Sequence, residues 1–248
     1  MDQRGNGPRR GSPDLPENII RLDSPTLTFR PDLGQRQRNE VLKGEDWENM
    51  AKAMSLTLGN ALGTLRGAPR KVRVFGYAQT GLMWTIGRHF DRTTSAELYG
   101  YDKDGLAVTN KDQERHTPLT GGNPDRSKLI AGSLDAANGS NPTIALGIGI
   151  QERYGAAVQQ AVPDIPLFWI EAVFIDGSQE AMQLVADIVA SVERLRRDHS
   201  LRELMLFWTT ANHVALLAAA NLTSHVVPTI RFMEWDHASA EYVELPMP

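Results

Sequence analysis

Two stretches of this sequence, VRVFGYAQTGLMWTIGRHF at residues 72–90 and LMLFWTTANHVALLAAANL at residues 204–222, follow one pattern at a constant offset of 132. Each begins with a short apolar run typical of a buried strand, continues through a small polar loop and ends in an apolar segment that suits a helix. Identities between the copies are few, so the evidence for a duplication is the ordered pattern. We therefore predict two related halves in one chain.

The same pattern extends to both sides of the two stretches. Amphipathic helices are predicted at 45–66 and 178–197, before the strands, and matching strands at 97–102 and 230–236, after the second helices. Asp46 is the expected N-cap of the first long helix. The expected fold is α/β, with two pseudo-symmetric Rossmann-like halves whose mostly parallel strands are covered by helices, in two sheets or in one continuous sheet.

The predicted organisation has three parts. Residues 1–22 form a disordered tail or linker, because Gly, Pro, Arg and Asp there show no apolar periodicity. Residues 23–142 form the first half, which begins with a strand at 26–29 and ends in a polar, turn-rich connection. Residues 143–248 form the second half, with strands at 143–150, 166–175 and 241–245 and a short helix at 154–162.

Composition excludes several classes of function. The 248 residues carry a formal net charge of −4, so no global field favours nucleic acid or an anionic membrane. There is no cysteine, which excludes disulfides and thiolate chemistry, and the six histidines lack the spacing of a metal site. No signal peptide and no run of about 18 apolar residues is present, so we expect a cytoplasmic protein.

The polar loops after the central strands form the main candidate site. In open α/β sheets, ligands bind outside the carboxyl ends of the strands, where helix N-termini offer free N–H groups that favour phosphate. Tyr77 adds a stacking face, and Gln, Thr and Asn add donors and acceptors. If the halves pack about a pseudo-twofold axis, both loops face one shared cleft. The alternative for Thr80 and Asn212 is that each only caps a helix.

A glycine motif in the second half partly matches a dinucleotide fingerprint. Gly147 and Gly149 end a strand that precedes a helix, but Glu152 stands where the third glycine is expected. A hydride-transfer enzyme is therefore disfavoured. The glycines could still let the backbone approach a ligand closely, which would bring Gln151 and Arg153 to the same cleft. The alternative is that they make room for a neighbouring helix.

The stretches 70–90 and 201–222, followed by TIRFMEWD at 229–236 and EYVEL at 241–245, resemble the SAVED domain of bacterial anti-phage systems (CBASS and some CRISPR-linked effectors). The resemblance extends from about Asp23 to the C-terminus. It implies two fused CARF-like units that bind a cyclic tri- or tetranucleotide second messenger, without catalysis. By the resemblance, loops 76–84 and 208–213 would hold the cyclic ligand. Together with Gln151 and Arg153 from the glycine motif, the predicted ligand-binding residues are Tyr77, Gln79, Thr80, Met83, Trp84, Gln151, Arg153, Thr209, Thr210, Asn212 and His213.

The resemblance also implies partners. Ligand binding in that family drives self-association and activates an effector, such as a nuclease, TIR or protease domain, in cis or in trans. No effector domain is recognisable in this sequence. We expect no cofactor besides the cyclic oligonucleotide, and neither a membrane nor duplex nucleic acid as a partner.

Two other functions are consistent with the same residues. A ring nuclease would use His213, beside Thr209 and Thr210, to position a ribose 2′-hydroxyl for attack on phosphate. A nucleotide-binding oxidoreductase is less well supported, because the glycine pattern is broken. Trp84 could belong either to the core or to the ligand site. Asp102 and Asp236, which end equivalent strands, are expected to serve turns rather than catalysis.

Overall fold

The computed structural model describes residues 41–65, 72–76, 78–90, 96–101, 107–109, 119–132, 143–149, 153–172, 175–222 and 229–247. All of them belong to the compact unit Leu33–Pro248. The predictions for the tail at 1–22 and for the strand at 26–29 lie outside the described residues.

The described elements alternate between strands and helices, as the sequence pattern predicts. The helices are α2 (Gly44–Leu65), α3 (Thr80–Arg88), α4 (Arg153–Ala161), α5 (Ser178–His199) and α6 (Asn212–Asn221), with the 3-10 turn η1 (Pro124–Arg126). The strands are β1 (Val72–Gly76), β2 (Ala96–Tyr101), β3 (Ala107–Thr109), β4 (Ser127–Ala131), β5 (Thr143–Gly149), β6 (Leu167–Glu171), β7 (Glu203–Thr209), β8 (Thr229–Asp236) and β9 (Glu241–Leu245).

The strands form two sheets, which settles the choice that the sequence left open. The first has the order β1-β2-β3, and the second has the order β4-β6-β5-β7-β8-β9. The central neighbours are parallel in both sheets, and β3, β4 and β9 are antiparallel additions at the edges. The segment between the halves is thus more than a connection, because it supplies one edge strand to each sheet.

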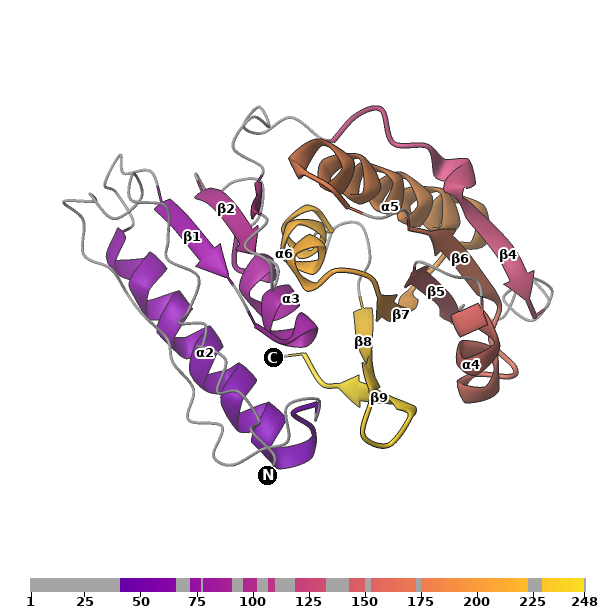
Figure 1. Cartoon of the computed structure of the whole chain (residues 1–248), viewed down its shortest axis with the longest axis horizontal. Helices are drawn as coiled ribbons and strands as arrows, with labels where there is room; N and C mark the ends of the chain where they lie inside the picture. Colours follow the sequence, from indigo (N-terminus) through magenta and orange to yellow (C-terminus); the bar gives the residue numbers. More distant parts are fainter. Residues whose placement is uncertain are drawn as a thin grey trace, which may run out of the picture. The chain divides into compact units, whose positions relative to one another are not determined.

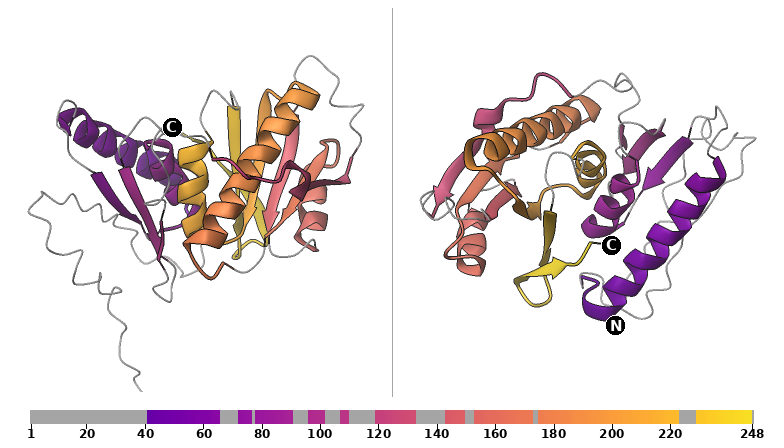
Figure 2. Two further views of the ribbon diagram at one scale, coloured as in Figure 1. Left: turned by 90° about the horizontal axis from the view of Figure 1, so that it is seen from above. Right: turned by 180° about the vertical axis from the view of Figure 1, so that it is seen from behind.

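Each face of the six-stranded sheet is covered by different helices. Side chains on one face, such as those of Leu206 and Phe232, pack with α5 and α6 in the larger core cluster. Side chains on the opposite face, such as those of Phe207 and Met233, pack with α4 in a smaller cluster. This division follows from the alternation of side chains along a strand, and the helices can be followed in Figures 1 and 2.

Helices α3 and α6, the equivalent helices of the two copies, lie side by side between the two sheets (Figures 1 and 2). A Cβ added to Gly87 of α3 would overlap the carbonyl oxygen of Leu216 and lie 2.8 Å from the Cβ of Ala219. Gly87 and Ala219 are equivalent positions of the duplication. The missing side chain at Gly87 is therefore what lets the two backbones approach at the centre of the molecule.

Two smaller observations complete the fold. Helix α2 begins at Gly44, so Asp46 lies inside its first turn and the prediction that it is the N-cap is wrong. The carboxylates of Glu45 and Asp46 still lie at the positive end of the helix dipole, where they are favourable. Among the described ranges, no helix combines the length and the apolar character needed to cross a bilayer.

Candidate functional site

The two polar loops of the duplication meet each other directly. The Thr80 hydroxyl donates to the Oδ1 atom of Asn212 over 2.8 Å, and Asn212 Nδ2 donates to the backbone oxygen of Ala78 over 3.1 Å. Thr80 and Asn212 are equivalent positions, 132 residues apart. A residue that bonds to its own equivalent lies on the twofold axis of an isologous contact. The predicted pseudo-twofold axis therefore passes between these two side chains.

Thr80 and Asn212 are the first residues of α3 and α6 rather than their N-caps. Gln79 and Ala211 occupy the N-cap positions, and neither makes a side-chain capping hydrogen bond. The alternative that these two polar residues only cap helices is thus not what the structure shows. Their side chains instead connect one half of the chain to the other.

The two helices run parallel, because equivalent residues meet both at their starts and near their ends. Thr80 contacts Asn212 at the start, and Gly87 packs against Ala219 about two turns later. Parallel helices direct their N-termini to the same end. The positive ends of two helix dipoles therefore lie next to each other at the axis, an arrangement that favours a bound anion.

The N-terminus of α3 is already occupied by a carboxyl group from within the chain. Glu234 on β8 accepts hydrogen bonds from the backbone N–H of Gly81 over 2.9 Å and from Nε2 of Gln79 over 3.2 Å. Oε1 of Gln79 in turn accepts from the backbone N–H of Leu42 over 3.1 Å. Burial raises the pKa of Glu234, and these hydrogen bonds oppose the rise. Gln79, predicted to contact a ligand, is thus engaged inside the protein on both sides of its amide.

The N-terminus of α6 is built differently, although it is the equivalent place. His213 stands where α3 has Gly81, and the alignment that pairs Asp102 with Asp236 pairs Gly100 on β2 with Glu234. A Cβ added to Gly100 would lie 2.5 Å from the Cβ of His213. The helix start of the first half, with the small residue Gly81, therefore meets a large acidic residue on a strand of the second half, and the helix start of the second half, with the large residue His213, meets a glycine on a strand of the first half. The strand residue at this position provides a carboxylate to α3 and none to α6.

Thr209 and Thr210, the other predicted residues of the second loop, lie at the carboxyl end of β7. Thr209 is partly exposed and donates to the backbone oxygen of Ile148 over 3.1 Å, while Thr210 is 9% exposed. Asn212 is the exposed member of this group. The structure thus brings Thr80, Thr209, Thr210 and Asn212 to one end of the molecule.

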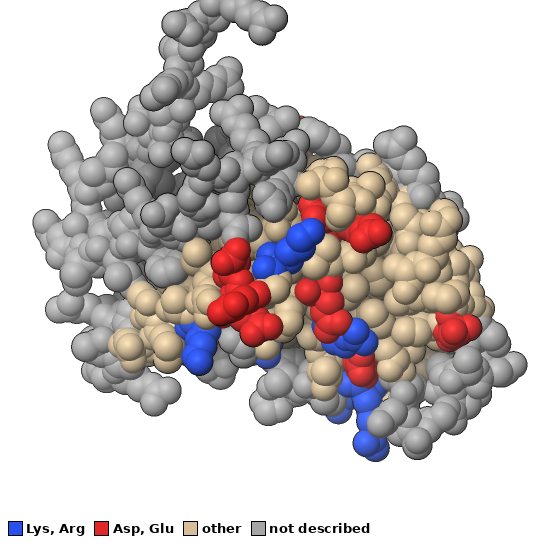
Figure 3. Space-filling model, turned by 90° about the horizontal axis from the view of Figure 1, so that it is seen from below, with Lys and Arg blue, Asp and Glu red and all other residues tan. Residues whose placement is uncertain are grey.

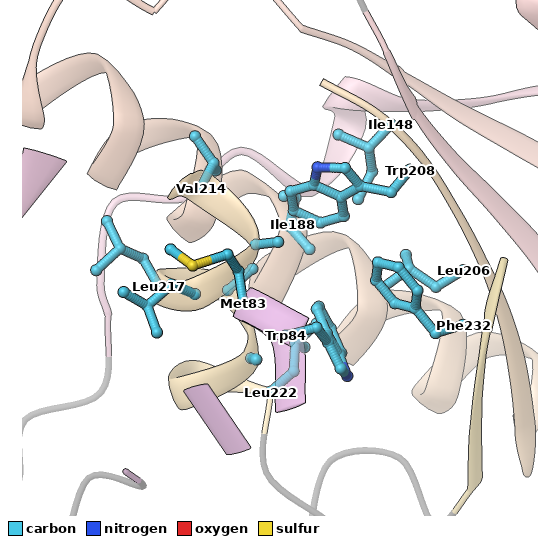
Figure 4. Packing of buried hydrophobic residues seen from close by; sticks show 14 of the residues in the cluster. Met83, Trp84, Ile148, Ile188, Leu206, Trp208, Val214, Leu217, Leu222 and Phe232 are labelled. Atoms are coloured by element: carbon cyan, nitrogen blue, oxygen red, sulfur yellow. The ribbon is translucent and has the colours of Figure 1, made fainter. Parts of the chain in front are cut away.

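Met83 and Trp84, by contrast, belong to the core. Both side chains are 0% exposed, and Figure 4 shows them among apolar residues of the larger cluster. The Trp84 ring lies 5.1 Å from the ring of Phe232 and 6.0 Å from that of Trp208, between centroids. These positions correct the prediction that Met83 and Trp84 contact a ligand, because neither reaches the surface in this structure. Their role is to hold α3 against the six-stranded sheet.

The remaining predicted residues lie partly outside the described structure. Tyr77 and Gln151 are outside the described residues, and Arg153 is described only as the first residue of α4. The predictions for these three residues therefore stay predictions.

Neighbouring side chains explain why positions 147, 149 and 155 are occupied by glycine. A Cβ on Gly147 or Gly149 would overlap the indole of Trp169, and one on Gly155 would lie 2.5 Å from Ile130. The broken fingerprint thus makes room for an indole ring against the backbone of β5. This favours the structural alternative for these glycines over the approach of a dinucleotide.

A polar cluster next to Glu234 anchors the turn between β8 and β9. Asp236 accepts from Lys43 Nζ over 2.9 Å, from the backbone N–H of Ala238 over 3.0 Å and from the Ser239 hydroxyl over 2.9 Å. Desolvation by burial works against the ionisation of Asp236, but these three bonds outweigh it and lower its pKa to about 2. Asp236 thus serves a turn, in agreement with the sequence-based expectation.

On the described part of the face shown in Figure 3, Lys and Arg side chains lie next to Asp and Glu side chains. Within the ranges that the structure describes, no group of three or more His, Asp or Glu side chains could hold a metal ion.

Comparisons with known proteins place the fold. No protein-family model and no curated protein matches the sequence. The Acinetobacter baumannii Cap4 SAVED/CARF-domain containing receptor with the cyclic trinucleotide 3′3′3′-cAAA gives a TM-score of 0.60 at 16% identity, covering 87% of this chain and 45% of that one. The same receptor with the cyclic trinucleotide 2′3′3′-cAAA gives a TM-score of 0.60 at 17% identity, covering 82% of this chain and 42% of that one.

The Moraxella osloensis Cap4 SAVED/CARF-domain containing receptor gives a TM-score of 0.51 at 17% identity, covering 83% of this chain and 43% of that one. The chain therefore has the SAVED/CARF fold, as the resemblance in sequence predicted. It spans less than half the length of these receptors.

Proposed function

We propose that this chain is a sensor that binds a cyclic oligonucleotide second messenger at the end of the molecule where α3 and α6 begin. The observation that carries the proposal is the hydrogen bond between Thr80 and Asn212, which joins equivalent loops at the pseudo-twofold axis. A ring of repeated nucleotides presents similar phosphates around a centre, so it suits a surface with related loops around an axis. The similarity in fold to receptors with cyclic trinucleotides supports the same class of ligand.

Within this site, the two halves receive the ligand differently. Glu234 occupies the N-terminus of α3 and accepts the backbone N–H of Gly81 that a phosphate would otherwise use. No carboxylate comes from the equivalent strand position at α6, because that position is Gly100. We expect a ligand phosphate to bind beside Asn212, where exposed amide and backbone donors provide charge-assisted hydrogen bonds.

The alternative functions receive less support. A ring nuclease would need a general base that reaches the ligand, whereas His213 is only 3% exposed and packs against Gly100. An oxidoreductase would need its cofactor at the glycines of β5, where the indole of Trp169 lies. We therefore propose that the chain binds its ligand without chemical turnover.

The proposed partners follow from the same role. A sensor passes its signal to an effector, here a nuclease, TIR or protease module in the same or another polypeptide. We propose that ligand binding changes the self-association of the chain and that this change activates the effector.

Calorimetry with cyclic di-, tri- and tetranucleotides tests the proposal. We expect saturable binding of at least one ring, and about tenfold weaker binding by Asn212→Ala. Asn60→Ala is the matched control, because Asn60 is an exposed asparagine on α2. The absence of heat with every ring would refute the function, and equal binding by both variants would refute the assignment of Asn212. Chromatography of the ligand after long incubation checks the absence of turnover, since cleaved product would overturn that part.

A further inference from the structure

The connections of the six-stranded sheet create a switch point between β5 and β7. From β5 the chain passes through α4 to β6 on one side, and from β7 it passes through α6 to β8 on the other side. Helix α4 packs on one face of the sheet and α6 on the opposite face. In open α/β sheets, the usual place for a ligand lies outside the carboxyl ends of the strands, where two such connections diverge.

The residues at this point form a row across the α4 face of the sheet. Gly149 and Thr209 are register partners at the ends of β5 and β7. Trp235 follows next on β8, two residues after Met233 of the same face, and it is paired with Tyr242 on β9. Between the Trp169 indole and Thr209 Oγ1, the strand end at Gly149 has no room for a side chain. The row thus consists of a glycine covered by the Trp169 indole, a hydroxyl and a large aromatic ring.

Trp235 differs from every other tryptophan of the chain. The sequence contains five, and Trp47, Trp84, Trp169 and Trp208 are exposed by 0%, 0%, 3% and 2%. Trp235 is only half-buried. Tyr242 meets it edge to face, at 5.0 Å between centroids and 70° between ring planes, and itself packs against Phe207 at 4.9 Å. A ring held by neighbours and still open to solvent is a preorganised stacking surface.

The same face contains buried donors without partners. The indole N–H of Trp169 and the hydroxyl of Tyr242 have no hydrogen-bond partner within the described part of the chain. Trp169 is 97% buried, as the complement of its 3% exposure, and the carbon atoms Cζ2 and Cη2 of its ring lie next to Gly149. A buried polar group without a partner is costly and becomes favourable when a ligand supplies an acceptor.

We infer that Trp235 provides the stacking face for a nucleobase at the carboxyl end of β8, next to Thr209 and away from the space that the Trp169 indole fills. This inference rests on the proposed function and adds to it the position of one base relative to the sheet. A base has a flat π-face that stacks on an indole and ring nitrogens that accept hydrogen bonds, so it matches both features of the row. The sequence-based site did not include Trp235, which lies 22 residues after the second loop's His213.

Collisional quenching of tryptophan fluorescence by iodide tests the inference, because iodide reaches exposed indoles and only Trp235 is open. We expect iodide to quench one class of tryptophan in the free protein, and Trp235→Phe to remove that class. Addition of the ring that gives the largest calorimetric signal should protect the same class. If the ring binds and Trp235 stays fully open to iodide, the inference is wrong while the proposed function stands.

Binding by variants provides an independent readout. We expect Trp235→Leu to weaken binding about tenfold, which corresponds to about 1.4 kcal/mol, and Trp235→Phe to stay within about threefold of the parent because it keeps a π-face. Leu129→Ala is the control, since Leu129 is 41% exposed on the edge strand β4. Circular dichroism and melting confirm that the variants fold. Equal affinity of the Leu and Phe variants would overturn the inference, whereas binding of no ring by the parent would overturn the proposed function instead.

Discussion

Two acidic side chains at the carboxyl end of β8, Glu234 and Asp236, have pKa values shifted in opposite directions. Burial raises the pKa of Glu234, whereas the bonds to Asp236 overcome its desolvation and lower its pKa to about 2. Of these two residues, Asp236 is therefore the one whose ionisation stabilises the fold. Its pKa in the folded protein lies below the ordinary 3.8. The stabilisation is present above the pKa of the unfolded chain and is lost as the pH falls through the folded value.

We predict that stability falls between about pH 4 and pH 2 through protonation of Asp236. In Asp236→Asn this component of the pH dependence should be absent, and stability at pH 7 should be lower by about 1 to 2 kcal/mol. Urea unfolding at a series of pH values measures both effects. Asp164→Asn, at an exposed aspartate before β6, is the control. If the Asp236→Asn variant kept the parent's acid dependence, the prediction would be contradicted.

The sequence predicted least well which side chains of the site point into the protein interior. Trp84 was compatible with either the core or the ligand site, because its orientation depends on how α3 packs against β8. Glu234 was not singled out, although a glutamate inside the apolar run FMEW is an unusual signal. Its partner, the N-terminus of α3, is more than 150 residues away in the chain. No local pattern contains that contact.

At the scale of elements, the contact between α3 and α6 depends on one small residue. Gly87 has no room for a Cβ against Leu216, whereas Gly59 in α2 has nothing within 4 Å of an added Cβ. Both glycines lie inside helices, so the cost in helix propensity is about the same for each. The difference between them isolates the packing of the two central helices.

We predict opposite effects for two alanine substitutions. Gly59→Ala should stabilise the protein by about 0.5 to 1 kcal/mol, since alanine is the better helix former. Gly87→Ala should destabilise it by about 1 to 3 kcal/mol, since the methyl group overpacks the interface. Denaturant midpoints of the two variants measure this. A gain in stability for Gly87→Ala would contradict the close approach of α3 and α6.

Element type and order follow from the local pattern, and element pairing does not. Apolar periodicity placed the helices and the parallel strands within a few residues, because each repeats a short-range signal. Helices α3 and α6 begin at Thr80 and Asn212, inside the polar loops rather than with the apolar segments that follow them. Those starts are set by the contact between the loops. The antiparallel pairing of β4 with β6 also depends on residues distant in sequence.

At the scale of the whole molecule, ligand binding at a pseudo-twofold axis contacts both halves together. We predict that the ring which binds in calorimetry also increases the molar mass of the protein, because a head-to-tail contact between copies builds open assemblies. Light scattering coupled to size exclusion, with and without the ring, measures this. The Asn212→Ala protein should need more ligand for the same shift. A constant mass at micromolar protein under saturating ring would contradict the proposed assembly.

At the two helix starts, a small residue faces a large one in opposite order: Gly81 faces Glu234, and His213 faces Gly100. This exchange bears on why the two halves belong to one chain. If the first half paired with a second copy of itself, Gly81 would meet Gly100 and leave a hole where Glu234 now sits. If the second half did so, the imidazole of His213 would compete with Glu234 for one space. Each half therefore fits the other and disfavours its own kind. Such one-way complementarity makes covalent fusion the natural state, and it gives a symmetric ring only one orientation that avoids the carboxylate.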